Sequence, residues 1–156
     1  MLKVGIINIT GYAGMELARI LHAHQGAEVV SVTGRSAAEE NLATVLPHLF
    51  KTNIEIGEEI TESVDVIFSA LPQVASAIAC VPYVRSGVKV IDISADFRLH
   101  DPDNYAYWYG TDHPAPDLLE TAVYGLTELN RSRISAGSLI ANPGCYPTAA
   151  LLALAH

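Results

Sequence analysis

The sequence has 156 residues, half of them hydrophobic and 17% charged, which suffices for one domain with a real core and is too apolar for a disordered chain. The net charge of -8, with only 9 scattered Lys and Arg residues, argues against a nucleic-acid partner, because phosphate binding needs clustered cations. No apolar run approaches the ~20 residues of a transmembrane helix, so a membrane partner is not expected either.

The first residues and the cysteine usage indicate a compartment. The opening MLKVGIINIT lacks the basic region, apolar region and cleavage site of a secretory signal. Cys80 and Cys145 have no metal or redox spacing, and the 6 histidines do not cluster. We therefore expect a reducing, cytoplasmic location and no metal site.

Strands and helices alternate along the chain. Short apolar runs rich in Val and Ile predict buried strands over residues 3–9, 27–34, 64–71, 88–94 and 137–144. Helices are predicted over residues 15–24, 73–87 and 148–156. This alternation predicts a Rossmann-like α/β fold, doubly wound around a mostly parallel sheet.

The sequence also predicts the apolar face of the first helix, the ends of the second helix and the nature of residues 95–133. The first helix has four residues at helical spacing, which predict its apolar face: Leu17, Ile20, Leu21 and His24. The second helix is expected to be interrupted or restarted at Pro82 and closed by Gly87. Residues 95–133 are rich in Asp, Pro, Tyr and His and predict a long ordered excursion over the surface that contains short helices.

The first strand leads into NITGYAGMELARIL, where a glycine turn separates strand from helix. Such a turn opens a dinucleotide-binding unit, because Gly11 and Gly14 let the backbone approach phosphate and the helix N-terminus supplies free N–H groups. An ordinary strand-to-helix turn is the alternative. Asn8 stands at the first glycine position of this fingerprint; asparagine tolerates a left-handed conformation, but its side chain can crowd the cofactor. We therefore expect Asn8→Gly to tighten NADPH binding.

The end of the second strand bears on the choice of cofactor. An acidic residue there binds the ribose hydroxyls of NAD, whereas Arg accommodates the 2′-phosphate of NADP. Arg35 and Ser36 come first in VTGRSAAEE, and Glu39 and Glu40 follow later. This order favours NADP(H); the alternative is that Arg35 is a solvated loop charge.

The two cysteines lie in different settings. Cys80 lies within a predicted helix among Ala, Ile and Val, which indicates a small buried hydrophobe. Cys145 follows a strand and NPG and precedes a helical run, with Pro147 in the first turn. A helix N-terminus stabilises a thiolate and offers N–H groups to an oxyanion or a leaving phosphate. A structural cysteine at a tight turn is the alternative reading.

Several stretches resemble the N-acetyl-γ-glutamyl-phosphate reductase family of arginine biosynthesis. They are GYAG, TGRS, VIDISADFR, DPDNYAYWYG, HPAP, AVYGLTELNR and NPGCYPTA, and they cover almost the whole chain. DISADFR and NPGCYPTA are much more specific than a glycine turn. The aspartate-semialdehyde dehydrogenases share fold and chemistry but differ in the residues around the cysteine.

The resemblance implies an NADPH-dependent acyl-phosphate reductase with Cys145 as nucleophile. Its thiolate attacks the acyl phosphate of N-acetylglutamyl phosphate, releases phosphate, and leaves a thioester that NADPH reduces to N-acetylglutamate semialdehyde. Asn142 and Gly144 shape the thiolate loop, and Arg98 is a candidate anion contact, with an ion pair to a nearby Asp as the alternative. The implied cofactor residues are Gly11, Tyr12, Ala13, Gly14, Arg35, Ser36, Leu71, Pro72 and Ser94.

The chain differs from this family at several residues and in length. Gln73 and Val74 stand where His or Asn followed by Gly is frequent, and Thr127 replaces a usual Pro. The family's chain is about twice as long, and its second half carries the substrate domain and the acid–base histidine. We therefore expect residues 1–144 to form the dinucleotide-binding domain and residues 145–156 to begin the helix that leads into the absent substrate domain.

The sequence leaves three hypotheses for the function of this chain. The first is the cofactor- and nucleophile-bearing part of the reductase, inactive as this chain alone and homo-oligomeric in its full-length family. The second is a non-catalytic NADP-binding module. The third is a reductase of a related acyl phosphate, either aminoadipyl, as in lysine synthesis, or of the aspartate-semialdehyde dehydrogenase type.

Overall fold

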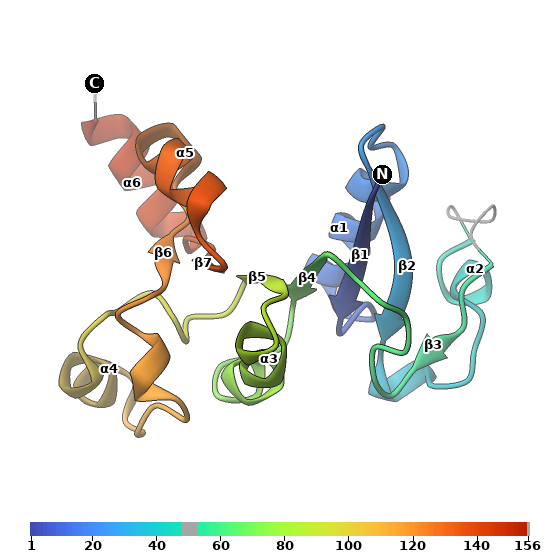
Figure 1. Cartoon of the computed structure of the whole chain (residues 1–156), viewed down its shortest axis with the longest axis horizontal. Helices are drawn as coiled ribbons and strands as arrows, with labels where there is room; N and C mark the ends of the chain where they lie inside the picture. Colours follow the sequence, from blue (N-terminus) through green and yellow to red (C-terminus); the bar gives the residue numbers. More distant parts are fainter. Residues whose placement is uncertain (48–52, 156) are drawn as a thin grey trace. The chain divides into compact units, whose positions relative to one another are not determined.

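The computed structural model describes residues 1–47 and 53–155, so His156 lies outside the described residues. The chain divides into two compact units, Met1–Leu71 and Pro72–His156, which are described separately (Figure 1). Within the described part of the chain, no helix has the length and apolar character needed to cross a membrane.

The first unit is a four-stranded parallel sheet with the order β3-β2-β1-β4. The first four strands of a Rossmann sheet follow this order. Its elements are β1 (Leu2–Ile7), α1 (Tyr12–His22), β2 (Ala27–Thr33), the 3-10 turn η1 (Arg35–Ala37), α2 (Leu42–Val45), β3 (Ile56–Gly57) and β4 (Val66–Ser69).

The core of the first unit forms between the sheet and α1. Val4 to Ile7 of β1 are consecutively buried, as expected of a strand covered on both faces. The buried face of α1 consists of Gly14, Ala18 and Leu21. The predicted apolar face was therefore wrong in part: Ile20 is 51% exposed and His24 lies beyond the end of the helix.

The second unit has three parallel strands in the order β5-β7-β6. Its elements are α3 (Ala75–Arg85), β5 (Lys89–Asp92), α4 (Pro102–Tyr109), the 3-10 turn η3 (Pro116–Leu118), β6 (Val123–Tyr124), α5 (Thr127–Ala136), β7 (Leu139–Ala141) and α6 (Cys145–Leu154). All strand pairs described in both units are parallel, which confirms the predicted α/β class.

Helix α3 runs through Pro82 without a break, so the expected interruption there was wrong. Proline leaves the carbonyl four residues earlier, that of Ile78, without its helical partner. Ile78 is 60% exposed, and the helix continues past this position to Arg85. The helix ends at Arg85, Ser86 is its C-cap, and Gly87 follows with φ +86°, as a terminating glycine should.

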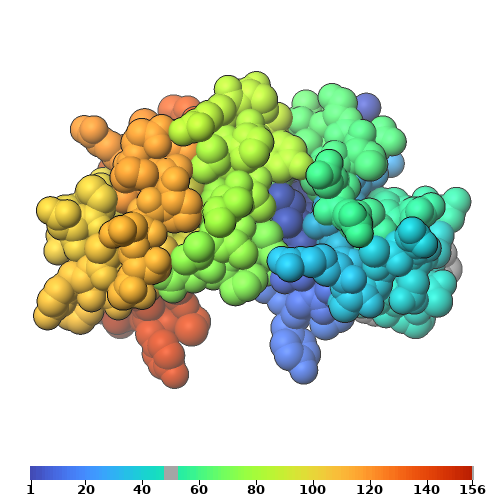
Figure 2. Space-filling model, turned by 90° about the horizontal axis from the view of Figure 1, so that it is seen from below, coloured from blue at the N-terminus to red at the C-terminus, as the bar shows by residue number. Residues whose placement is uncertain are grey.

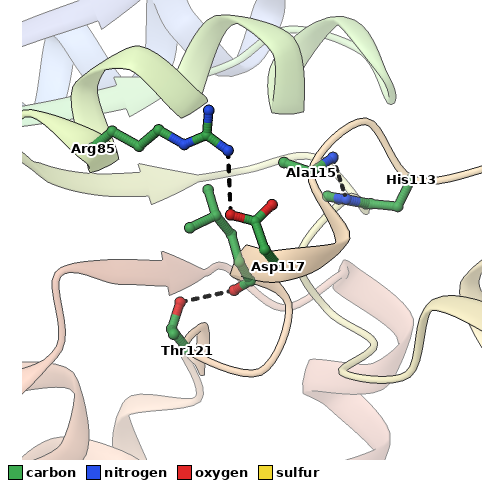
Figure 3. A network of polar contacts seen from close by, with 6 residues as sticks. Arg85, His113, Ala115, Asp117 and Thr121 are labelled. Atoms are coloured by element: carbon green, nitrogen blue, oxygen red, sulfur yellow. Dashed lines mark hydrogen bonds and ion pairs between the residues drawn. The ribbon is translucent and has the colours of Figure 1, made fainter.

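The excursion over residues 95–133 is ordered and carries more structure than short helices. It contains α4, η3 and the sheet strand β6, which pairs with β7. Asp117 of η3 binds Arg85 of α3 at 3.2 Å, as Figure 3 shows. Nearby, the Ala115 N–H donates to His113 Nδ1 (3.0 Å) and the Thr121 hydroxyl donates to the Leu118 carbonyl (2.8 Å).

Candidate active site

Glycine is required at the turn between β1 and α1. A Cβ on Gly14 would lie 2.3 Å from the Asn8 carbonyl oxygen and 2.9 Å from the Ile9 Cα, which are distances that backbone atoms cannot relieve. Gly11 is extended and caps α1, and the Met15 N–H donates to its carbonyl at 2.9 Å. Glycine at position 14 is therefore required by the close packing of α1 on this turn, whereas the approach of the backbone to a phosphate stays a prediction.

Asn8 adopts the left-handed conformation, with φ +67°, as predicted for this residue type. Its Nδ2 donates to the Ala70 carbonyl at 2.9 Å, and its N–H donates to the Thr33 hydroxyl at 3.2 Å. The amide thus ties the turn to the chain that follows β4. The prediction that this side chain crowds a cofactor is not tested by the structure. Any gain from Asn8→Gly would come with the loss of the hydrogen bond to Ala70.

The N-terminus of α1 is open to an anion. No side chain caps it, and its first turn contains no acidic residue. Tyr12 is 92% exposed and Ala13 is exposed as well. The free N–H groups of the first turn and the positive end of the helix dipole therefore fit a phosphate group.

The end of β2 lies against this turn. The Ser36 hydroxyl donates to the Thr10 hydroxyl at 3.1 Å, which joins the two segments predicted to hold the cofactor. Arg35 begins η1 and is exposed, and among the described residues it forms no ion pair. A free guanidinium beside the glycine turn fits the 2′-phosphate of NADP.

Ser94 follows β5 and is bound within the protein. Its hydroxyl donates to Asp92 Oδ2 at 2.7 Å and accepts from the Asp96 N–H at 3.0 Å. Asp92 is fully buried and also accepts from the hydroxyl of Ser76 and from the Ser94 N–H. Burial raises the pKa of Asp92, and the hydrogen bonds from both serines oppose this rise. The Ser94 hydroxyl is therefore engaged on both sides, and its predicted cofactor role stays untested.

Of the remaining predicted cofactor residues, Leu71 is half-buried and ends the first unit. Pro72 is exposed and opens the turn before α3, where its carbonyl accepts from the Ser76 N–H at 3.0 Å. Their place beside a cofactor stays a prediction.

Cys145 is the first residue of α6 and is exposed. Gly144 caps the helix, and its carbonyl accepts from the Thr148 N–H at 3.0 Å and the Thr148 hydroxyl at 2.8 Å. No acidic residue lies in the first turn, and no residue of α6 is buried; the red C-terminal part of the chain lies at the surface in Figure 2. The thiol is thus accessible and directed from a helix N-terminus, as predicted.

Arg98 holds the loop before the thiol. Its Nε donates to the Asn142 carbonyl and one terminal nitrogen donates to the Ile93 carbonyl, both at 2.9 Å. The alternative of an ion pair with an Asp was wrong, since the described ion pairs do not include Arg98. The other terminal nitrogen would lie 2.9 Å from a Cβ at position 144, so the absence of a side chain at Gly144 makes room for the guanidinium.

Asn142 forms two hydrogen bonds in this loop, and its part in catalysis stays a prediction. The Asn142 N–H donates to the Asp92 carbonyl at 2.8 Å, and Asn142 Nδ2 donates to the Pro143 carbonyl at 3.1 Å, so Asn142 shapes the loop.

Cys80 is fully buried in α3, as predicted, with its sulfur 3.9 Å from the Ser76 hydroxyl.

Sequence reasoning missed Asp96 and Tyr105, which the structure brings together with Val74. Asp96 and Tyr105 are fully buried, and Asp96 Oδ1 accepts from the Val74 N–H at 2.9 Å and from the Tyr105 hydroxyl at 2.8 Å. The available signal was the second Asp of DISADFR, which is an acid placed between apolar residues.

A cavity of about 410 Å³ in the first unit lies away from these residues. Its lining includes Met1, Leu21 and Ala27, at the starts of β1 and β2 and the end of α1. The glycine turn lies at the opposite end of these strands, where parallel sheets bind ligands. No group of His, Cys, Asp and Glu side chains able to hold a metal occurs among the described residues.

The β1 strand, the glycine turn and α1, whose N-terminus has no side-chain cap, define a Rossmann-type dinucleotide-binding domain, and the second unit adds an exposed thiol. A family profile described as "Semialdehyde dehydrogenase, NAD binding domain" matches residues 3–137. The chain belongs to this family of nicotinamide-dinucleotide-binding domains.

Several curated relatives share one name. A protein of Dehalococcoides mccartyi strain BAV1, named N-acetyl-gamma-glutamyl-phosphate reductase, is 55% identical over 152 residues, which are 97% of this chain and 45% of the relative. A protein of the same name from Magnetococcus marinus is 46% identical over 158 residues, 98% of this chain and 45% of the relative. The chain therefore spans about 45% of the length of these relatives.

Solved structures share the fold. Aspartate semialdehyde dehydrogenase II from Vibrio cholerae superposes with a TM-score of 0.72 at 18% identity, over 99% of this chain and 45% of that one. Aspartate semialdehyde dehydrogenase from Candida albicans, solved with NADP, has a TM-score of 0.63 at 18% identity, over 99% of this chain and 46% of that one. At this identity the likeness concerns the fold alone.

Proposed function

We propose that this chain supplies the cofactor-binding domain and the nucleophile of a reductase that converts N-acetylglutamyl 5-phosphate to N-acetylglutamate 5-semialdehyde, a step of arginine biosynthesis. The observation that carries the proposal is the exposed Cys145 at the start of α6, in a loop held by Arg98. The reductase name of relatives up to 55% identical supports the choice of substrate. The boundary between Gly144 and Cys145, where the dinucleotide-binding part would end, belongs to this proposal.

The chemistry of the thiol follows from its position. The Cys145 thiolate attacks the acyl carbon, the carbon–sulfur bond forms, and the carbon–oxygen bond to phosphate breaks, so that inorganic phosphate leaves with the electron pair. The N–H groups of the first turn of α6 can stabilise the oxyanion of this step or the departing phosphate, since no acidic residue opposes them there.

The cofactor site is proposed at the glycine turn of the first unit. The open N-terminus of α1 would hold the pyrophosphate, and Arg35 and Ser36 would contact the 2′-phosphate of NADP(H). Tyr12 and Ala13, exposed in the first turn, would border the phosphates. When bound, NADPH supplies the hydride that reduces the thioester.

The test separates acylation from turnover. The chain is incubated with an acyl phosphate, and the expected result is one acyl group on Cys145, found by peptide mass mapping and removed by hydroxylamine. Cys145→Ser should abolish the adduct, whereas Cys80→Ser, which alters a buried cysteine, should keep it. NADPH binding without any acylation would instead make this chain a cofactor-binding module.

Three further expectations stay predictions. The chain alone should show negligible reductase turnover, and phosphate-dependent oxidation of the semialdehyde by this chain would contradict that. Homo-oligomerisation of the complete enzyme and a cytoplasmic location also stay predictions; the location is favoured by an exposed thiol that must remain reduced.

A further inference from the structure

Asn8 lies where neighbouring strands of the first unit end. It is the first residue after β1, which runs between β2 and β4 in the sheet (Figure 1). Its N–H donates to the hydroxyl of Thr33, the last residue of β2, at 3.2 Å, and its Nδ2 donates to the carbonyl of Ala70, directly after β4, at 2.9 Å. Asn8 therefore binds the carboxyl ends of both strands that flank β1.

The same residue also contacts the glycine turn and the helix that follows it. A Cβ on Gly11 would lie 3.2 Å from Asn8 Nδ2, and a Cβ on Gly14 would lie 2.3 Å from the Asn8 carbonyl oxygen. The neighbouring Ile9 N–H donates to the Thr33 carbonyl at 2.8 Å. The position of Asn8 thus sets where the turn and the N-terminus of α1 lie against the strand ends, and all of these residues belong to the first unit.

Asparagine gives this turn a tether that glycine lacks. Its φ of +67° is the left-handed conformation that glycine adopts freely and asparagine tolerates. Glycine would keep this backbone conformation, but it would lose the bond to the Ala70 carbonyl and leave the turn with more freedom. A binding loop that is already held in its bound conformation avoids part of the entropic cost of binding.

We propose that Asn8 is a positioning residue. By binding the ends of β2 and β4, it holds the glycine turn and the first N–H groups of α1 in the arrangement that receives the pyrophosphate of NADPH. The proposal rests on the proposed function, which puts the pyrophosphate at this helix N-terminus, in a chain that matches an NAD-binding family profile. Asn8 acts through the turn and need not touch the cofactor.

The first measurement is a calorimetric titration of the 156-residue chain with NADPH. Asn8→Gly removes the side-chain tether, and we expect roughly fivefold weaker binding, the equivalent of one hydrogen bond between neutral groups. The sequence alone favours the opposite result, because it treats the side chain as an obstacle to the cofactor. Unchanged or tighter binding by Asn8→Gly would overturn the proposal.

Two fragments of NADPH locate the effect. 2′-Phospho-ADP-ribose contains the pyrophosphate without the nicotinamide, and it should lose the same roughly fivefold affinity in Asn8→Gly. 2′-AMP lacks the pyrophosphate, so its affinity should change by less than about twofold. An equal loss for both fragments would indicate a general loss of structure, and a loss confined to NADPH would place the effect at the nicotinamide; either result would overturn the proposal.

A second pair of variants tests the bond to β2. Thr33→Val removes the hydroxyl that accepts the Asn8 N–H, and it should also weaken NADPH binding about fivefold. Thr33→Ser is the conservative variant, which keeps a hydroxyl and should bind NADPH within about twofold of the unaltered chain. Equal affinities of the two variants would contradict the positioning role, and this pair also serves if Asn8→Gly does not fold.

The outcomes separate this inference from the proposed function. Binding of NADPH by the unaltered chain, with no loss in Asn8→Gly, would overturn the positioning role and leave the proposed function standing. Failure of the unaltered chain to bind NADPH at all would overturn the proposed function, and this inference with it.

Discussion

Single residues carry the most specific information in this chain, and they differ in how well their role follows from sequence. The left-handed conformation of Asn8 follows from its residue type at a glycine position. The same conformation at Val74 does not follow from its residue type; its only signal in the sequence is that Gly is frequent at this position of the resembled family, and the residue's N–H is held by Asp96, 22 residues away. Local propensity cannot report a constraint set by a distant carboxylate.

Val74→Gly should therefore stabilise the chain, which is unusual for a substitution by glycine. Relief of the positive φ outweighs the extra freedom of glycine in the unfolded chain, and we expect a gain of about 0.5–1 kcal/mol in unfolding free energy by urea titration. Val84→Gly, in the last turn of α3, is the control and should lose about 1 kcal/mol. Equal losses for both variants would show that Val74 is not strained.

The two cysteines should react at very different rates. Cys145 is exposed at a helix N-terminus, whereas Cys80 is fully buried, so iodoacetamide at neutral pH should alkylate Cys145 at least tenfold faster. Peptide mapping over time measures both rates in one sample. Equal or reversed rates would contradict an accessible, activated thiolate.

At the scale of elements, the long strands and helices were predictable and the short ones were not. The two-residue strands β3 and β6 have no room for a hydrophobic pattern and exist because a neighbouring strand supplies their partners. The apolar face of α1 was missed in part because Gly14 and Ala18 carry little hydrophobic signal, yet they allow the helix to pack closely.

The loop between β7 and α6 is bound by one side chain from the segment between β5 and α4. Arg98 donates to the carbonyls of Asn142 and Ile93 through a planar fork that lysine does not possess. Arg98→Lys should cost about 1–2 kcal/mol of unfolding free energy and slow acylation of Cys145. Arg85→Lys, which alters an exposed ion pair with Asp117, should change stability by less than about 0.5 kcal/mol and leave acylation as it is. Similar behaviour of the two variants would remove Arg98 from the loop's support.

At the scale of the whole molecule, stability should fall on acidification through a buried histidine. Burial lowers the pKa of His113 below its ordinary value of about 6.5, so the unfolded chain binds more protons than the folded chain below that pH. The unfolding free energy should therefore decrease as the pH drops from about 6.5 to 5, by at most about 1.4 kcal/mol per pH unit.

His113→Asn is the matched variant for this prediction, because the asparagine oxygen can accept the Ala115 N–H in place of Nδ1. Urea titrations at several pH values should show a shallower decline in the variant than in the unaltered chain. Parallel declines would mean that other groups account for the acid sensitivity.

The fold class, the glycine turn and the thiol loop were all predictable because each has a distinctive local pattern. The contacts that join them, from Ser36 to Thr10 and from Arg98 to Asn142, arise only when separate segments meet. Calorimetric titration of the chain with NADPH and with NADH tests the account most directly. We expect NADPH to bind more tightly and Arg35→Ser to remove most of the difference; tighter binding of NADH, or no binding of either, would contradict it.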